Sequence, residues 1–235
     1  MKNKNIWHGL IYHIWSILLA IALLFASLTL SISLNSKDMN YYHDYQVENQ
    51  IDLRTGKKQD ELDIISRDLI NYLDMGQDDL LTRHFNEREI AHMRDVFGLY
   101  ELNRKITDVS LTIIIVSLFI NIIFKNKDMV TKKTAYYLIA LISVAILFAI
   151  LASGNFNKYF VAFHELFFDN DLWLLDPKTD LMIQMLPLGF FIGMAKNIFI
   201  YFALAIFLVL LILLFDVYFN KKSKGCVLCN LKVVG

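Results

Sequence analysis

Four long apolar blocks dominate the pattern of hydrophobic and polar positions along this 235-residue chain. They cover residues 15–34, 106–124, 134–152 and 197–215. At about 1.5 Å of rise per residue, each block is long enough for a helix to cross a hydrocarbon layer of about 30 Å. Unpaired backbone groups are costly in lipid, so the blocks predict membrane-spanning α-helices.

The composition supports a membrane protein. Hydrophobic residues make up 56% of the chain and the mean hydropathy is +0.45, against roughly 45–50% apolar residues in soluble domains. A formal net charge of zero argues against a nucleic-acid partner. The first block follows Lys2 and Lys4 as a signal peptide would, but it is longer than a signal core and has no small-x-small cleavage site, so we expect a retained helix.

Lysines in short segments set the expected orientation, because cytoplasmic loops are rich in Lys and Arg. They mark the amino end, the connector and the tail as cytoplasmic and place both termini inside. The predicted organisation is a first span ending at 34, an extracytoplasmic segment 35–105, a second span 106–124, a connector 125–133, a third span 134–152, an extracytoplasmic or interfacial segment 153–196, a fourth span 197–220 and a tail 221–235. The predicted fold class is therefore an all-α integral membrane protein with four transmembrane helices and a mostly helical extracytoplasmic cap, to which a short β-hairpin can belong.

The first outer segment carries signals for a strand and a helix. Val47, Ile51 and Leu53 share one parity before an Arg54–Lys57 turn, which predicts a short β-strand or hairpin. Residues 60–73 carry apolar side chains at three- and four-residue spacing and are followed by Gly76, which predicts an amphipathic helix.

A second helix start in this segment is strongly signalled. Asn86 with Glu89 three residues later forms a capping-box pattern, and the flanking Phe85 and Ile90 can form a hydrophobic staple. We therefore expect a helix from Glu87. At about 100° per residue, one stripe packs inward, and it consists of Ile90, Met93, Phe97 and Tyr100.

His92 lies off that packed stripe, and Asp95 follows three residues later, within reach of the imidazole. The carboxylate can hold one ring nitrogen as a donor. The other notable histidine is His164, which stands among five aromatic residues in the short segment 157–168. That segment is too short to span a membrane and suits the lipid–water boundary. A second short apolar run, 181–194, contains Pro187 and two glycines and suggests a re-entrant or interfacial piece.

The remaining candidates favour plainer interpretations. His43 and His84 suit an interfacial belt and a surface loop. His164-Glu165 begins like a zinc-protease H-E-x-x-H motif, but Phe168 stands where the second histidine belongs. Cys226 and Cys229 form a lone C-x-x-C in the predicted cytoplasmic tail, whose role the sequence leaves open. A non-enzymatic membrane sensor or binding protein and a membrane metallohydrolase both remain alternatives.

Two stretches carry a resemblance to a known family. The first is His92-Met93-Arg94-Asp95-Val96, and the second runs from Phe163-His164-Glu165 through Asn170 and Trp173 to Asp176-Pro177. With the four-span layout, they resemble the lipoprotein intramolecular transacylases of low-GC Gram-positive bacteria. The cysteine-bearing tail is not part of that pattern.

The resemblance implies an acyltransferase acting at the outer membrane face on a diacylated lipoprotein, with membrane lipid around it and without a cofactor or metal. The sn-2 acyl chain would move from glycerol to the α-amino group of the lipoprotein's own terminal cysteine, giving a lyso-form lipoprotein. The family's two essential histidines match His92 and His164.

Acid–base chemistry suggests how the two histidines would divide the work. We expect His164 to accept the amine proton, and His92, oriented by Asp95, to act on the ester. The opposite assignment stays open. Supporting or substrate-binding candidates, including possible oxyanion donors, are Asp95, Arg94, Glu165, Asn170, Trp173 and Asp176.

Overall fold

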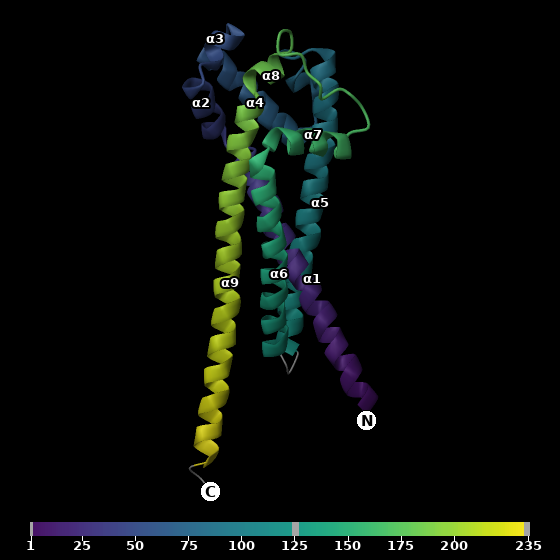
Figure 1. The fold of residues 1–235 in the computed structure, drawn as a ribbon, viewed down its shortest axis with the longest axis vertical. Coiled ribbons are helices and arrows are strands. Elements are labelled where there is room, and N and C mark those ends of the chain that lie inside the picture. Colours follow the sequence, from purple (N-terminus) through teal and green to yellow (C-terminus); the bar gives the residue numbers. More distant parts are fainter. Residues whose placement is uncertain (1, 124–126, 233–235) are drawn as a thin grey trace. The chain divides into compact units, whose positions relative to one another are not determined.

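The structure is a computed structural model that describes residues 2–123 and 127–232, with side chains described for residues 9–120, 129–151 and 153–219. Within these ranges every regular element is helical (Figure 1). The elements are α1 (Lys2–Asn35), α2 (Met39–Glu48), α3 (Ile51–Thr55), α4 (Gln59–Met75), the 3₁₀ turn η1 (Asp78–Leu80), α5 (Glu87–Ile123), α6 (Lys127–Gly154), α7 (Phe156–Phe167), α8 (Leu181–Met185) and α9 (Leu188–Lys232).

The chain divides into two compact units. The first comprises residues 1–29, 106–149 and 201–235, and the second comprises residues 30–105 and 150–200. In the first unit, α1, α6 and α9 meet in a small buried cluster of Ala20, Leu138, Phe202 and Ile206. Ala20 has a minimal side chain, which lets neighbouring helices approach closely as helices packed in lipid do.

Three helical stretches are long and apolar enough to cross a membrane: Gly9–Asn35, Met129–Leu151 and Leu188–Phe219. Only 17% of the second and 11% of the third is buried inside the protein, so most of their apolar side chains need lipid around them. These candidate spans include the predicted spans at 15–34 and 197–215 and, as far as Leu151, that at 134–152. The predicted span 106–124 lies in α5, but its end falls outside the described residues and it stays a prediction.

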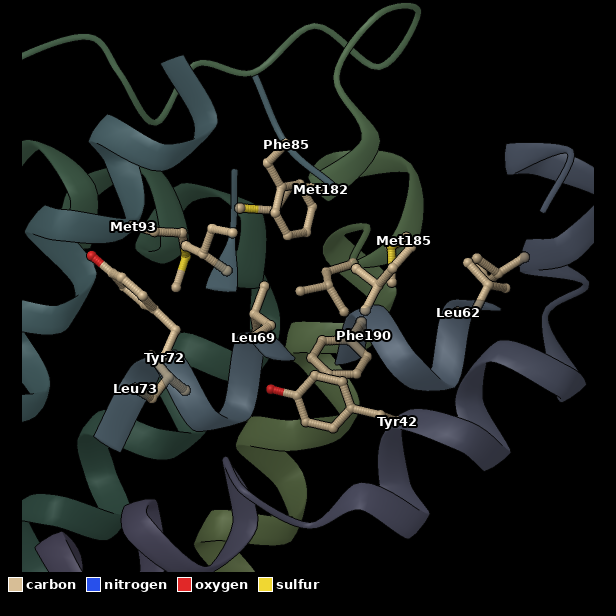
Figure 2. Close-up of a cluster of buried hydrophobic side chains, with 14 of the residues drawn as sticks. Tyr42, Leu62, Leu69, Tyr72, Leu73, Phe85, Met93, Met182, Met185 and Phe190 are labelled. Carbon is tan, nitrogen blue, oxygen red and sulfur yellow. The ribbon is translucent and has the colours of Figure 1, made fainter. Parts of the chain in front are cut away.

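The second unit has the larger core, part of which Figure 2 shows. The buried stripe of α4 packs there as its spacing predicts, and it consists of Leu62, Ile65, Leu69 and Leu73. Met182 and Met185 of α8 and Phe190 of α9 close the same cluster. The core therefore ties segments of the first outer region to segments that follow α7 by more than ten residues.

The start of α5 confirms the predicted capping box. Asn86 accepts hydrogen bonds from the backbone N–H groups of Arg88 and Glu89 at 2.9 and 3.0 Å, and its own N–H donates to Glu89 Oε2 at 2.8 Å. Glu89 Oε1 also accepts the N–H of Met182 at 2.6 Å, although Glu89 is only 1% exposed. Burial raises the pKa of this carboxyl, and the contact joins the first turn of α5 to the first turn of α8.

The predicted hairpin at residues 46–56 is wrong, because this stretch forms the end of α2 and all of α3. The alternating residues do not share a buried face: Ile51 is 1% exposed, whereas Leu53 is 75% exposed. The inward positions follow helical spacing instead, with Tyr42 and Gln46 both buried. Gly56 ends α3 in the left-handed conformation, with φ of +67°, rather than turning a hairpin.

The run 181–194 forms α8 and the first turns of α9. Pro187 separates α8 from α9, and Gly189 and Gly193 lie inside α9. A side chain at Gly193 would collide with the hydroxyl of Tyr41, which donates a hydrogen bond to Phe190 O at 2.6 Å. These glycines therefore admit tyrosines from α2 instead of breaking the helix.

Replacing Gly76 by Ala should destabilise the protein more than replacing Gly56 by Ala. Both glycines have positive φ, which costs an alanine about 1 kcal/mol. A Cβ at Gly76 would in addition stand 2.6 Å from the ring of Phe97, whereas nothing lies within 4 Å of one at Gly56. Because Phe97 packs against Tyr72 and under Arg104, we expect an extra loss of about 1–3 kcal/mol. Thermal unfolding in detergent measures both, and equal losses would contradict the packing argument.

Candidate functional site

Two histidines that are 72 positions apart in the chain face each other in the second unit. His92 lies in the second turn of α5 and His164 near the end of α7, and their ring centroids are 6.2 Å apart at an interplanar angle of 31°. His92 is 9% and His164 8% exposed. The structure thus brings together the two histidines singled out by the sequence.

Residues at the end of α7, distant from α5 in the sequence, bury His92. Its ring stands edge-on to Phe168, with the centroids 5.5 Å apart. The core stripe of α5 is on the other side, where Ile90 and Met93 are buried as predicted. His92 is therefore buried against the residues around α7, apart from the apolar core.

Aromatic rings surround His164. Phe160 lies 4.4 Å from its ring, Trp173 lies 4.8 Å away at 34°, and Phe163 and Phe168 each lie 5.5 Å away, all between centroids. The helical spacing of α7 places Phe160 one turn before His164. Trp173 comes from the loop that follows, so the enclosure is completed by a residue from outside the helix.

A backbone contact sets the tautomer of His164. Its Nδ1 lies 2.6 Å from the carbonyl oxygen of Phe160. A carbonyl can only accept, so Nδ1 carries the hydrogen and donates it. In a neutral imidazole the other nitrogen, Nε2, then has the free lone pair. His164 is thus arranged to accept a proton at Nε2.

Burial keeps both imidazoles neutral. Desolvation is the largest cause that lowers the pKa of His92 to about 4, and the nearby His164 lowers it further. Asp95 has a smaller effect in the opposite direction. Desolvation also lowers the pKa of His164, although its hydrogen bond to Phe160 opposes the change. Nδ1 of His92 is buried and has no hydrogen-bond partner in the structure. Such an atom is costly to bury, so it is a natural contact for a bound molecule.

The sequence predicted that Asp95 holds a ring nitrogen of His92, and the structure shows a different partner for this carboxylate. Its Oδ2 instead accepts a hydrogen bond from Nδ2 of Asn170 at 2.9 Å. The ring of His92 is turned towards Phe168 and His164, while the carboxylate is engaged by the loop after α7. Asp95 therefore acts on His92 through its charge alone, which favours the protonated form.

The other supporting candidates are placed at differing distances from this chemistry. Nε and Nη2 of Arg94 donate to Asp78 Oδ2 at 2.8 and 2.5 Å, and Glu165 is exposed. Asp176 shapes a turn: its Oδ1 accepts the N–H of Lys178 at 2.9 Å and its N–H donates to Asp180 Oδ2 at 2.7 Å. Of the candidate oxyanion donors Arg94, Asn170 and Trp173, it is Trp173 that packs directly on a histidine.

Arg88 is a residue that the sequence interpretation missed. Its Nη2 donates to the carbonyl oxygens of Asp171 and Leu174 at 2.5 and 3.3 Å, on either side of Trp173. The spacing offered a signal, because Arg88 precedes His92 by four residues and so shares its helix face.

The remaining histidines lie elsewhere. His43 Nδ1 is 2.9 Å from Asp63 Oδ1, and His84 Nε2 is 2.8 Å from Asp68 Oδ2. Asp63 raises the pKa of the partly exposed His43. Among the described residues, no three His, Cys, Asp or Glu side chains gather as they would around a metal ion. The side chains of Cys226 and Cys229 fall outside the described part of the chain.

Comparison with known proteins gives a consistent answer. The family model of the lipoprotein intramolecular transacylase Lit matches residues 16–191. A solved structure of the membrane-integral lipoprotein intramolecular transacylase Lit from Bacillus cereus is 21% identical, with a TM-score of 0.79, and covers 92% of this chain and 99% of that chain. A variant of that protein with one histidine replaced by arginine is 20% identical at a TM-score of 0.80, covering 95% and 100%.

At these identities the solved structures show the same fold, whereas the family model matches the sequence itself. No curated protein matches the chain by sequence. The family match favours an acyltransferase over both the sensor and the metallohydrolase. Since it extends over most of the chain, this protein belongs to the lipoprotein intramolecular transacylase family and is a membrane acyltransferase.

Proposed function

We propose that the protein moves the sn-2 acyl chain of a diacylglyceryl lipoprotein from glycerol to the α-amino group of that lipoprotein's own N-terminal cysteine. The observation that carries this proposal is the pair of buried imidazoles, His92 and His164, with centroids 6.2 Å apart between aromatic walls. An apolar enclosure suits an acyl ester, and two neutral histidines suit a reaction that moves one proton from nitrogen to oxygen.

The reaction balances within a single substrate molecule. The amine nitrogen attacks the acyl carbonyl carbon, a C–N bond forms, and the C–O bond to the sn-2 oxygen breaks. The proton lost by nitrogen is gained by the departing glycerol oxygen, so the product is an isomer of the substrate. Because both reacting groups sit on one bound molecule, positioning can supply an effective molarity of about 10⁵–10⁸ M. No protein nucleophile is then needed.

His164 is the proposed proton acceptor. Its Nδ1–H is engaged by Phe160 O, which leaves Nε2 to take the proton of the attacking amine in the tetrahedral intermediate. The resulting imidazolium stands in a desolvated site that disfavours its charge, so it readily gives the proton to the leaving glycerol oxygen. Burial therefore assists the second half of the transfer.

His92 is the proposed partner on the ester side. With its pKa lowered to about 4, it is neutral and serves as a hydrogen-bond donor to the developing oxyanion rather than as a cation. Nδ1 of His92 is buried without a hydrogen-bond partner, and we expect it to form a hydrogen bond with the bound substrate. Trp173, stacked on His164, is the second proposed donor for that oxyanion.

The proposed topology has four spans, with the site on the extracytoplasmic face of the plasma membrane. It adds a span at 106–124 to the three long apolar stretches and rests on the lysines of the connector and tail. Residues 35–105 and 153–196 then share one side of the membrane, as the contact between His92 and His164 requires. Diacylated lipoproteins reach the outer leaflet, so a site on that side meets its substrate and the surrounding lipid.

Replacing either buried histidine should abolish most of the transfer. We expect His164→Asn and His92→Asn to lower the rate with a diacylated lipopeptide by about 10²-fold or more, the usual contribution of an acid–base group. The readout is tandem mass spectrometry: the intact mass is unchanged, and fragment ions show the acyl group on nitrogen. His43→Asn is the control, because His43 contacts Asp63 and neither of the two buried histidines, so this variant should keep wild-type activity.

Two outcomes would contradict this assignment. A wild-type protein that releases free fatty acid, with loss of one acyl mass, would be a hydrolase. A His164→Asn variant with normal turnover would remove proton transfer from His164, because asparagine keeps a polar side chain but does not titrate.

Acid should destabilise the protein through His92. Its pKa is about 4 in the folded protein and 6.5 when exposed, so the unfolded chain binds more protons between these values and stability falls as the pH falls through them. At 1.36 kcal/mol per pKa unit, the loss is up to about 3 kcal/mol. Unfolding midpoints at pH 7.5 and 4.5 should therefore differ less in His92→Phe than in the wild type.

His43→Phe is the control with the opposite sign for the acid experiment. Asp63 raises the pKa of His43, so this pair stabilises the folded state below the usual histidine pKa and the effect is lost as the pH rises. The variant should lose as much stability in acid as the wild type, or more. An unchanged acid sensitivity in His92→Phe would contradict the burial of a neutral imidazole.

Cysteine labelling tests the topology. In a Cys226→Ala/Cys229→Ala background, a membrane-impermeant maleimide added to intact cells should label Glu48→Cys and Lys178→Cys, both at exposed positions, because both outer segments face outward. Lys132→Cys, in the connector, should react only after the membrane is opened. The reverse pattern would invert the orientation, and labelling of only one of the first two would contradict four spans.

A further inference from the structure

We infer that Arg88 is a positioning residue which, together with Asp95, holds the segment Asn170–Leu174 in place so that Trp173 closes over His164. We call this segment the strap. The inference rests on the proposed function of His164, and it adds to that function the residues that complete the enclosure around the proposed base.

Arg88, His92 and Asp95 form one line along α5. Spacings of four and three residues rotate by about 400° and 300°, so all three side chains lie within one narrow face of the helix. His92 stands between the other two and meets the ring of His164. The two charged residues that flank it both contact the strap.

Arg88 contacts the strap through backbone carbonyls. Its Nη2 donates to the oxygens of Asp171 and Leu174, which bracket Trp173 in sequence. A guanidinium presents several donors in a rigid plane, so a single side chain can hold two carbonyls of a turn. The contact is made to backbone carbonyls and does not depend on the side chains of the strap. The residue types at 170–174 therefore do not predict it.

Asp95 holds the other end of the strap through Asn170. Asn170 Nδ2 donates to Asp95 Oδ2 at 2.9 Å, while its Oδ1 accepts the N–H of Leu172 at 3.0 Å. The amide is thus used at both ends, once to attach the strap to α5 and once to shape its turn. A carboxylate at position 170 would keep the turn but lose the donor.

Little apolar burial holds the strap, which makes these polar contacts decisive for its position. Asn170, Asp171 and Leu174 are exposed, and Leu174 is 53% exposed. Trp173 is the residue that reaches inward, where its ring lies 4.8 Å from that of His164. Because exposed charged contacts contribute little to global stability, their loss should disturb the site far more than the fold.

Trp173 fluorescence reports the strap directly. In a Trp7→Phe/Trp15→Phe background it is the only tryptophan left of the three, and a protonated imidazole quenches a stacked indole. In the otherwise unchanged protein, quenching should develop below pH 6.5, since burial lowers the pKa of His164. Arg88→Met should reduce the quenching and move its midpoint towards 6.5, whereas Arg67→Met, at an exposed position on α4, should do neither.

Activity and rescue give the second readout. Arg88→Met and Asn170→Asp should each lower kcat by about 10-fold or more, because a displacement of about 1 Å in a site can cost 10²-fold. Their unfolding midpoints should stay close to that of the wild type. Asn170→Asp sets two carboxylates against each other, and adding Asp95→Asn restores one amide and one carboxylate. The double variant should recover both kcat and the Trp173 quenching.

Three results would overturn the inference. One is an Arg88→Met variant with unchanged kcat and quenching, another is a double variant no better than Asn170→Asp alone, and the third is a loss of activity that merely follows a lower unfolding midpoint. A wild-type protein without transacylation would instead reject the proposed function. The fluorescence titration needs no substrate, so the two failures are distinguishable.

Discussion

The structure around the candidate site depends on the desolvation of two imidazoles. Water removed from His92 and His164 leaves both rings neutral near physiological pH, and the same loss of water makes either imidazolium a ready proton donor. Phe168 contributes to both environments, with its ring 5.5 Å from each histidine. Phe168, at the end of α7, therefore helps to set the pKa of both His92 on α5 and His164 on α7.

This desolvation requires parts of the chain that have no direct chemical role. The first turn of α5 is held by the Asn86 cap and by Glu89, which also binds the start of α8. The core of α4, α5, α8 and α9 fixes that turn from the other side. Trp173 of the strap packs on the ring of His164 and completes the aromatic enclosure around it. The buried pair His92 and His164 is thus supported by a buried carboxylate, an apolar core and a loop held by hydrogen bonds.

Local patterns in the sequence predicted what depends on neighbours a few residues apart. The α4 stripe, the capping box at Asn86 and the off-stripe position of His92 follow from helical spacing, and the structure confirms all three. The same kind of local reasoning failed at residues 46–56. Parity of three apolar residues suggested a strand, but Leu53 is exposed and Gln46 buried, because packing on α4 selects a helical face there.

From the sequence by itself came the apolar stretches, the start of α5 at its capping box and, through two short motifs, the choice of His92 and His164 as candidates. These properties follow from hydropathy and from spacing within one helix. The tertiary structure decided the partners: Asn170 rather than His92 for Asp95, Asp78 for Arg94, and the strap for Arg88. A side chain with several donors or acceptors can satisfy them in many ways, and only the approach of segments that lie 16 to 83 residues apart in the sequence selects one.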